Sequence, residues 1–205
     1  HDIVAMVPPY IDMASERVVN EYNWEQERWR EHQGHVRAAR IAEILAHGAS
    51  AGAEAELDYP LAETHLAVIL WVPHDDPNDT PFAALAELTA AAETLAEEAQ
   101  VRGRFLLTPV DRATVWLWLP LRTPSAFDAV AVARRAGAIH QGVAIAVGEP
   151  GAGIDGFRAS HRQAAVAREI AVLRRPTARR ITAFAEPGLS TVAMLRHNLD
   201  DTRSW

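Results

Sequence analysis

The residues of this 205-residue chain that most resemble a binding site lie in one glycine-rich segment, 148–165, with the sequence GEPGAGIDGFRASHRQAA. The segment directly follows an apolar run that predicts a strand, and it opens a predicted helix. A glycine-rich turn before a helix can hold a phosphate group, because the first backbone N–H groups of a helix have no partner inside it. The spacing fits neither the dinucleotide fingerprint nor the Walker loop, which needs Lys followed by Ser or Thr.

Two interpretations of this segment stay open. In the first, it is a turn whose glycines supply positive φ before a helix with Phe157, Ala164 and Ala165 facing inward. In the second, it is a ligand-binding or interface motif. The members of that motif are Gly148, Glu149, Gly151, Arg158, Ser160 and His161.

The histidines do not predict catalysis. Ser160 and His161 have the chemistry of a nucleophile and a base, but consecutive residues on a helix point about a quarter-turn apart and do not face each other. His140 falls in a predicted loop and has no carboxylate nearby in sequence to orient it. We therefore expect a protein that is not an enzyme and has no catalytic residues.

A polar run before the first long helix invites a metal interpretation. It contains His74, Asp75, Asp76, Asn78 and Asp79, and hard cations prefer such oxygen-rich loops. The spacing matches no metal-binding loop, however, and the same residue types build turns and helix caps. The chain has no cysteine, which removes thiolate metal sites and disulfides together. We expect neither a metal nor another cofactor.

Composition indicates a globular protein without a nucleic-acid surface of its own. The chain is 49% hydrophobic and 23% charged, with a net charge of −7, whereas binding to DNA phosphates rests on clustered Lys and Arg. No run approaches the roughly 18 apolar residues of a membrane span. Together with the absence of cysteine, this favours a cytoplasmic protein without membrane contact. The one basic cluster, at the predicted end of a helix where cations are favoured, is Arg174, Arg175, Arg179 and Arg180.

Residues 1–48 have the spacing of an amphipathic helical segment. Apolar side chains recur from Ile11 to Leu45, and Gly48 suits the helix end. An apolar stripe on this helix requires cover from the same domain, from sequence outside the chain, or from a second copy of the chain. We expect a homodimer, and we expect the chain to be a piece of a longer protein. The stripe consists of Val18, Tyr22 and Trp29.

Residues 49–56 lack large apolar side chains and predict a linker, so a second domain is expected from Leu57. The elements in that domain alternate in the order β-α-β-β-α-β-α-β. A hairpin placed between helical crossovers predicts the split, ferredoxin-like α+β fold with an antiparallel sheet. The predicted elements are His65–Val72, Pro81–Val101, Arg104–Val110, Thr114–Leu121, Ser125–Ala136, Val143–Val147, Ile154–Leu173 and Arg180–Ala185.

One predicted strand carries two tryptophans. Residues alternate between the faces of a strand, so Trp116 and Trp118 should share one face while Val115, Leu117 and Leu119 occupy the other. Such a face can hold a flat ligand or pack against a helix, and the second arrangement is the more common use of tryptophan.

The glycine-rich segment resembles the PucR/CdaR-type bacterial transcription regulators, whose central domain carries a strand, Gly-Glu-Pro-Gly and then Phe-Arg-x-Ser-His-x-Gln-Ala. The resemblance extends from about Leu57 to about Pro187. Residues matching this pattern are Gly148, Glu149, Pro150, Gly151, Gly156, Phe157, Arg158, Ser160, His161, Gln163 and Ala164.

The resemblance implies a GGDEF-like domain at 57–187 that has lost nucleotide-cyclase chemistry. A working cyclase would carry Gly-Gly-Asp/Glu-Glu-Phe at the hairpin, where this chain has Asp111, Arg112 and Ala113. It would also carry a metal-binding Asp near the end of the first strand, where this chain has Trp71.

The resemblance also implies what lies around this domain. Residues 188–205 would begin a connecting helix, whose residue pattern runs over Thr191–Leu199. This helix would lead to a C-terminal helix-turn-helix domain outside the chain. DNA would be bound only through that domain. The expected function is thus a non-catalytic regulatory or sensory module, with a small-molecule effector as a candidate partner. The alternative is a nucleotide-binding or residual cyclase-like domain.

Overall fold

The computed structural model describes residues 36–73, 81–101, 103–122, 127–173 and 180–189. Several sequence predictions lie outside these ranges. They are the stripe within 11–35, the polar loop 74–79, three of the clustered arginines within 174–179 and the connecting helix within 191–199.

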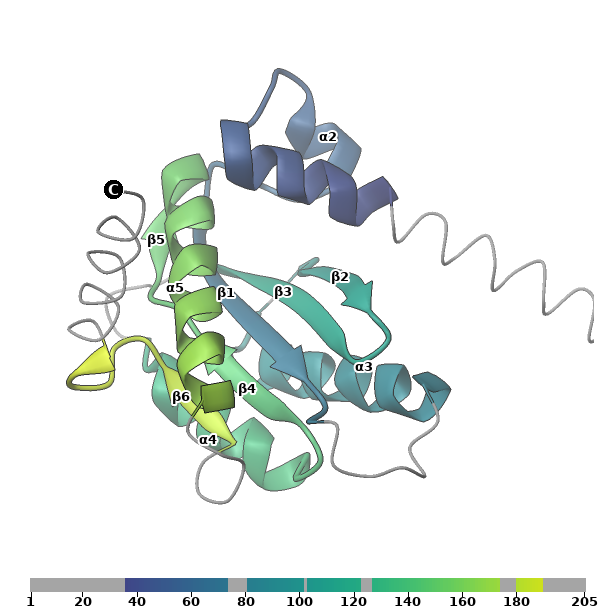
Figure 1. The fold of residues 1–205 in the computed structure, drawn as a ribbon. Coiled ribbons are helices and arrows are strands. Elements are labelled where there is room, and N and C mark those ends of the chain that lie inside the picture. The colour runs from purple at the N-terminus through teal and green to yellow at the C-terminus, as the bar shows by residue number, and fades with distance from the viewer. Residues whose placement is uncertain (1–35, 74–80, 102, 123–126, 174–179, 190–205) are drawn as a thin grey trace, which may run out of the picture.

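The described chain forms a six-stranded sheet with helices on both faces (Figure 1). Neighbouring strands follow the order β2-β3-β1-β4-β6, and the short β5 pairs with β1 beside β4. The elements are α2 (Ala53–Leu57), β1 (Thr64–Trp71), α3 (Pro81–Glu98), β2 (Leu106–Asp111), β3 (Thr114–Leu121), α4 (Ala129–Ile139), β4 (Ala144–Val147), β5 (Gly151–Ala152), α5 (Gly153–Leu173) and β6 (Ile181–Ala183), preceded by a helix over residues 36–47.

The strand order confirms the predicted ferredoxin-like arrangement. β1 runs antiparallel to both of its neighbours, β3 and β4. Helix α3 leads from β1 to β2 at one edge of the sheet, and α4 leads from β3 to β4 on the other side of β1. β6 then adds to β4 in parallel, after the crossover through α5. The sheet is therefore mixed, where an antiparallel sheet was predicted.

Local chemistry sets the element ends. The Asp111 carboxylate accepts a hydrogen bond from the Ala113 backbone N–H at 2.8 Å, which closes the predicted β2–β3 hairpin. Helix α4 begins later than predicted, because the Asp128 carboxylate accepts from the Ala131 N–H at 2.9 Å and caps it there.

The two faces of the sheet follow the alternation of strand residues. On one face, Leu66, Val68 and Leu70 of β1 pack with α3 and α4. On the other face, Ala67 and Trp118 pack beneath the N-terminal helices and α5. The prediction for β3 is confirmed, because its tryptophans and its Val115, Leu117 and Leu119 lie in separate apolar clusters.

The segment predicted as a linker is part of the packed structure. Helix 36–47 ends at Gly48, as predicted, with φ of 92°. Residues 49–56, however, include the start of α2, whose Ala53 is 2% exposed and shares a cluster with Ile41 and Ile44 of the first helix. Small residues here allow a close turn between two helices, which the composition of a linker does not distinguish from a flexible spacer.

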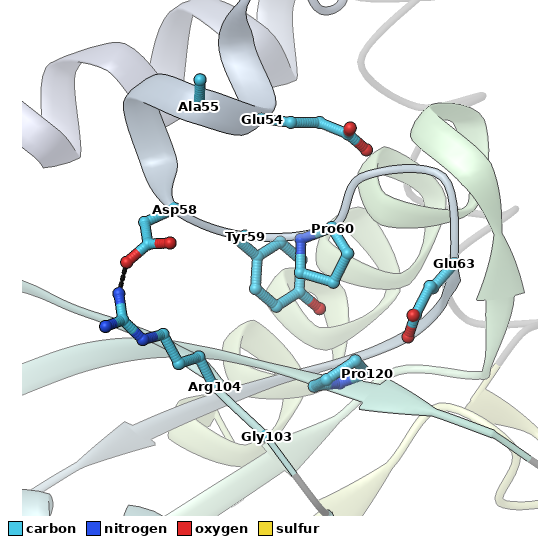
Figure 2. Close-up of a pocket in the computed structure, with 9 residues that line it drawn as sticks. All are labelled: Glu54, Ala55, Asp58, Tyr59, Pro60, Glu63, Gly103, Arg104 and Pro120. Carbon is cyan, nitrogen blue, oxygen red and sulfur yellow. Dashed lines mark ion pairs between the residues drawn. The ribbon is translucent and has the colours of Figure 1, made fainter.

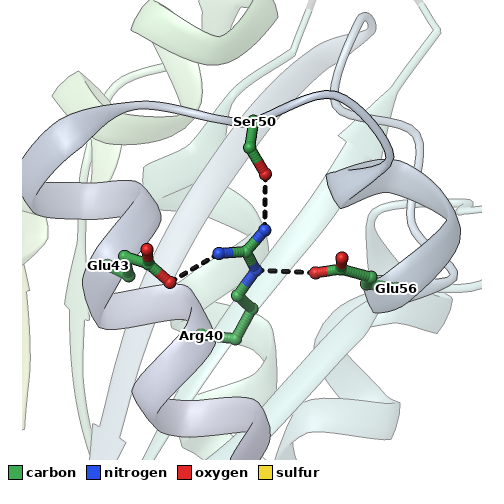
Figure 3. Close-up of polar contacts among 4 residues, drawn as sticks. All are labelled: Arg40, Glu43, Ser50 and Glu56. Atoms are coloured by element: carbon green, nitrogen blue, oxygen red, sulfur yellow. Dashed lines mark hydrogen bonds and ion pairs between the residues drawn. The ribbon is translucent and has the colours of Figure 1, made fainter.

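A network of polar contacts centred on Arg40 joins these two helices (Figure 3). Its guanidinium group donates to the carboxylates of Glu43 and Glu56 and to the Ser50 hydroxyl. The two carboxylates raise the pKa of Arg40, so it stays charged at every working pH. The helix 36–47 is therefore fixed to α2 by charge as well as by apolar packing.

No helix among the described ranges is both long enough and apolar enough to cross a membrane.

Candidate functional site

The glycine-rich motif holds helix α5 close to the sheet. A side chain on Gly156 would overlap the backbone of Gly151, and one on Gly148 would overlap the Ser160 carbonyl group. These glycines are required for close approach of two backbones rather than for positive φ, which within the motif occurs only at Gly153, at 62°. The prediction of a turn with positive φ therefore applies to one glycine of the motif.

Ser160 completes the hydrogen bonding of the central strand. On one side Ala67 of β1 pairs with Trp118 of β3. On the other side the pairing is interrupted between β4 and β5, and Ala67 has no paired residue there. There the Gly148 N–H donates to the Ala67 carbonyl at 3.0 Å, and the Ser160 hydroxyl oxygen accepts from the Ala67 N–H at 2.8 Å. Ser160 is fully buried, and its hydroxyl replaces a backbone partner that the interruption removed.

Arg158 and Glu149 connect α5 to its surroundings. The Arg158 guanidinium donates to the carbonyl groups of Leu45 and Ala46, in the last turn of helix 36–47, at 3.0 and 3.1 Å. A cation there also complements the negative end of the helix dipole. The Glu149 N–H donates to the Gln163 side-chain oxygen, and the Gln163 amide donates back to the Glu149 carboxylate.

His161 lies in a stack of aromatic rings. Its ring stacks on Trp118, with centroids 5.1 Å apart, and meets the edge of Trp116 at 4.6 Å. Phe157 stacks on the same indole at 4.4 Å, while the Trp118 N–H donates to the Phe157 carbonyl. Burial, with a smaller contribution from the charge of Arg162, lowers the pKa of His161 to about 4, so the imidazole is neutral at pH 7.

A second buried histidine adjoins this stack and was not singled out from the sequence. The His65 ring meets Phe157 edge-on at 5.6 Å. A carbonyl oxygen only accepts, so the His65 Nε2–H donates to Leu61, and Nδ1 accepts from the Tyr59 hydroxyl at 2.9 Å. Burial lowers the pKa of His65 and raises that of Tyr59. The available signal was a lone polar residue within the apolar run of β1.

The residues considered for catalysis each have different partners. His140 ends α4, and its Nε2 lies 2.9 Å from the Thr94 hydroxyl of α3. Ser160 and His161 have different partners, the β1 backbone and the tryptophan rings. No cluster of three or more His, Asp or Glu side chains able to hold a metal occurs within the described part of the chain.

An open pocket of about 520 Å³ lies between α2, the start of β1 and the β2–β3 region (Figure 2). Asp58 forms an ion pair with Arg104 across it, and Glu54 accepts a hydrogen bond from the Ala62 N–H. Three carboxylates against one guanidinium make the pocket unfavourable for phosphate groups. Its lining residues are Glu54, Ala55, Asp58, Tyr59, Pro60, Glu63, Gly103, Arg104 and Pro120.

Residues 47–170, more than half of the chain, match the family of GGDEF-like domains. The chain therefore belongs to that family. The matched range starts with the last residue of helix 36–47 and includes α2, which agrees with the packing of α2 on the sheet. The chain matches no curated protein at a significant level.

Proposed function

We propose that the chain is a non-catalytic regulatory module of a PucR/CdaR-type bacterial transcription regulator. In this proposal, it controls a helix-turn-helix domain that follows Trp205 and provides all contacts with DNA. The observation that carries the proposal is the motif from Gly148 to Ala164 within a domain of the GGDEF-like family. A fixed link between the N-terminal helix and the domain supports it, because a regulatory module must transmit changes between its parts.

The contacts of the motif are those expected of such a link. Arg158 holds the end of helix 36–47, and Phe157 packs in the same apolar cluster as Ile41 and Ile44. Ser160 attaches the same helix α5 to the central strand. A movement of the N-terminal helix would therefore be transmitted to α5 through buried contacts. Interpreting Gly148, Glu149 and Gly151 as a ligand-binding motif stays a prediction.

The residues at the hairpin favour a domain without cyclase activity. Asp111 closes the turn through its own carboxylate, and Arg112 is an exposed cation where cyclase chemistry would need a carboxylate. Trp71 is 8% exposed at the end of β1, so a bulky apolar ring occupies the place of a metal-binding side chain.

The test is DNA binding by the full-length protein and by this chain separately. We expect the full-length protein to retard fragments of its own promoter region in a gel-shift assay, and the 205-residue chain to retard none. Full-length Arg158→Gln should bind the same fragments, but the expression of a reporter gene under the promoter should differ from its expression with the unchanged protein. A full-length protein that binds no promoter fragment would contradict the proposal.

Nucleotide binding is the second candidate, favoured by membership of the GGDEF-like family. Calorimetry of this chain with GTP, ATP and Mg²⁺ tests it directly. We expect no heat of binding above dilution, because the cyclase carboxylates are replaced and the pocket in Figure 2 is acidic. A saturable heat would favour the nucleotide-binding function instead.

A further inference from the structure

Three buried polar atoms have no hydrogen-bond partner among the described residues. They are the Thr108 hydroxyl oxygen, His161 Nε2 and Arg168 Nε. A buried donor or acceptor without a partner is costly, and such atoms are rare in native proteins. Separate elements supply them, yet all three lie on the sheet face that carries Trp116.

Thr108 and His161 border Trp116 from opposite elements. Thr108 of β2 lies directly across the ladder from Trp116, so both side chains stand on the same face of the sheet. His161 of α5 meets the Trp116 ring at 4.6 Å from above that face. Thr108 is fully buried and His161 is 9% exposed, so neither atom obtains a partner from bulk water.

Arg168 lies two helical turns beyond His161, and it therefore projects from the same side of α5. Its guanidinium carbon is 5.6 Å from the centre of the Trp71 ring, and Nη2 donates a long hydrogen bond of 3.4 Å to the Thr114 hydroxyl. Trp71 and Thr114 are directly paired, two residues along the strands from Trp116.

Trp116 separates two apolar clusters. It packs against the cluster of helix 36–47, α2 and Phe157, and also against the cluster of α5 and β4. Its side chain is half-buried, whereas Trp118 is fully buried. Trp116 is therefore the accessible ring at the boundary between the N-terminal helices and the far half of α5.

We propose that Thr108, Trp116, His161 and Arg168 form a binding site for a small organic anion. Its anionic oxygen accepts from Arg168 Nε, a hydroxyl or carbonyl group pairs with Thr108 or His161, and its planar part lies against Trp116. This inference rests on the proposed regulatory function, for which it supplies the chemical class of the effector.

The charges define the ligand class. Arg168 is a permanent cation, and its planar guanidinium group suits carboxylate and phosphate oxygens. The neutral imidazole of His161 adds no charge, so the site carries one positive charge and fits one anionic group. A carboxylate and a phosphate monoester share this chemistry, whereas a nucleoside triphosphate would bring several uncompensated charges.

NMR of the 205-residue chain tests the site through two of its own signals, Arg168 Nε–H and Trp116 Nε1–H. The probes are benzoate and phenyl phosphate, with benzamide as the neutral control of the same shape. We expect saturable shifts of both signals with one or both anions, and none with benzamide. The stronger of the two anions identifies the ligand as a carboxylate or a phosphate ester.

Two variants and one control variant distinguish a binding site from a packing defect. Thr108→Val removes the unpaired hydroxyl at constant shape, so it should stabilise the fold while weakening anion binding by roughly tenfold. Arg168→Gln should abolish the binding, and Arg162→Gln on the exposed side of α5 should leave it unchanged.

Three results would overturn the site: no shift with either anion at 10 mM (roughly the limit of specific weak binding), equal shifts with benzamide, or unchanged affinity in Arg168→Gln. None of them depends on DNA. A failed anion titration with intact promoter binding therefore refutes the site alone, and the reverse result refutes the regulator alone.

Discussion

His161 behaves in this fold as an aromatic residue rather than as a base. Its ring lies against two tryptophans, and its Nε2 is buried without a partner. Protonation would place a charge in that apolar stack. The pKa of about 4 expresses that cost, because the unfolded chain would take up the proton near pH 6.5.

The first prediction concerns acid stability. Between pH 6.5 and pH 4 the unfolded state binds the His161 proton and the folded state does not, so stability falls as the pH falls through this range. Urea unfolding at pH 7 and pH 5 should show a loss of about 2 kcal/mol from this group. His161→Phe keeps the stacking and should remove that part of the loss. An identical pH dependence in the variant would contradict the assignment.

The second prediction concerns the Ser160 hydroxyl. Ser160→Ala leaves the buried Ala67 N–H without its acceptor, so the free energy of unfolding should fall by about 2 kcal/mol. Chemical denaturation measures this change. The exposed Ser50→Ala is the control, and it should cost less than about 0.5 kcal/mol. Equal effects of the two substitutions would show that the hydrogen bond to β1 is unimportant.

The third prediction concerns the contact between Gly151 and Gly156. In an ordinary helix, alanine is favoured over glycine, yet Gly156→Ala should destabilise the protein by about 3 kcal/mol because its methyl group meets the Gly151 backbone. Gly142→Ala is the matched control, since its methyl group meets only the movable end of the Glu87 side chain. Thermal unfolding of both variants checks the difference, and a neutral Gly156→Ala would refute the close approach.

At the scale of elements, α5 is the part that joins the others. It contacts the central strand β1 through Ser160 and the last turn of helix 36–47 through Arg158. The same helix presents His161 and Arg168 to the sheet face around Trp116. Both the structural motif and the proposed anion site thus depend on the position of one helix.

The fourth prediction is that Arg158 controls the attachment of helix 36–47. Arg158→Met removes both hydrogen bonds to the last turn of that helix but keeps an apolar stem. Amide hydrogen exchange in 36–47 should rise at least several-fold, while exchange in β1 and β3 stays unchanged. Arg162→Met on the same helix should alter neither region. A uniform rise in exchange would indicate global destabilisation instead of local detachment.

At the scale of the whole molecule, the described N-terminal helix belongs to the domain. Ile41 and Ile44 are fully buried against residues of the sheet and α5, so removing residues 1–48 would expose the core. The apolar stripe predicted at Val18, Tyr22 and Trp29 precedes the described part. A truncation that tests dimerisation should therefore end before residue 36.

The fifth prediction is the oligomeric state. We expect the chain to sediment as a dimer and the protein lacking residues 1–35 to sediment as a folded monomer, because the stripe needs an apolar partner. Circular dichroism of the truncated protein controls for its folding. Trp29→Glu in the full 205-residue chain should give the same dissociation. An unchanged mass in both variants would refute dimerisation through this segment.

The sequence by itself determined the elements and their faces. Alternation in β3 separated Trp116 from Val115, the residues Asp111 to Ala113 predicted the hairpin, and the order of strands and helices predicted the split fold. These features depend on near neighbours in the chain, and local spacing records them. The motif at Gly148 likewise predicted the GGDEF-like domain through residue identities alone, while the PucR/CdaR-type assignment stays a prediction.

Only the tertiary structure decided what the motif residues do. The partner of Ser160 is 93 residues away and that of Arg158 is 113 residues away, so no local pattern could indicate either contact. The short β5 and the packing of α2 also depend on long-range contacts, with β1 and with the first helix and the sheet. These contacts override the turn-like and linker-like composition of the two segments. The placement of Thr108, His161 and Arg168 on the sheet face of Trp116 also arises only when α5 lies on the sheet, because β2, β3 and α5 together supply these residues.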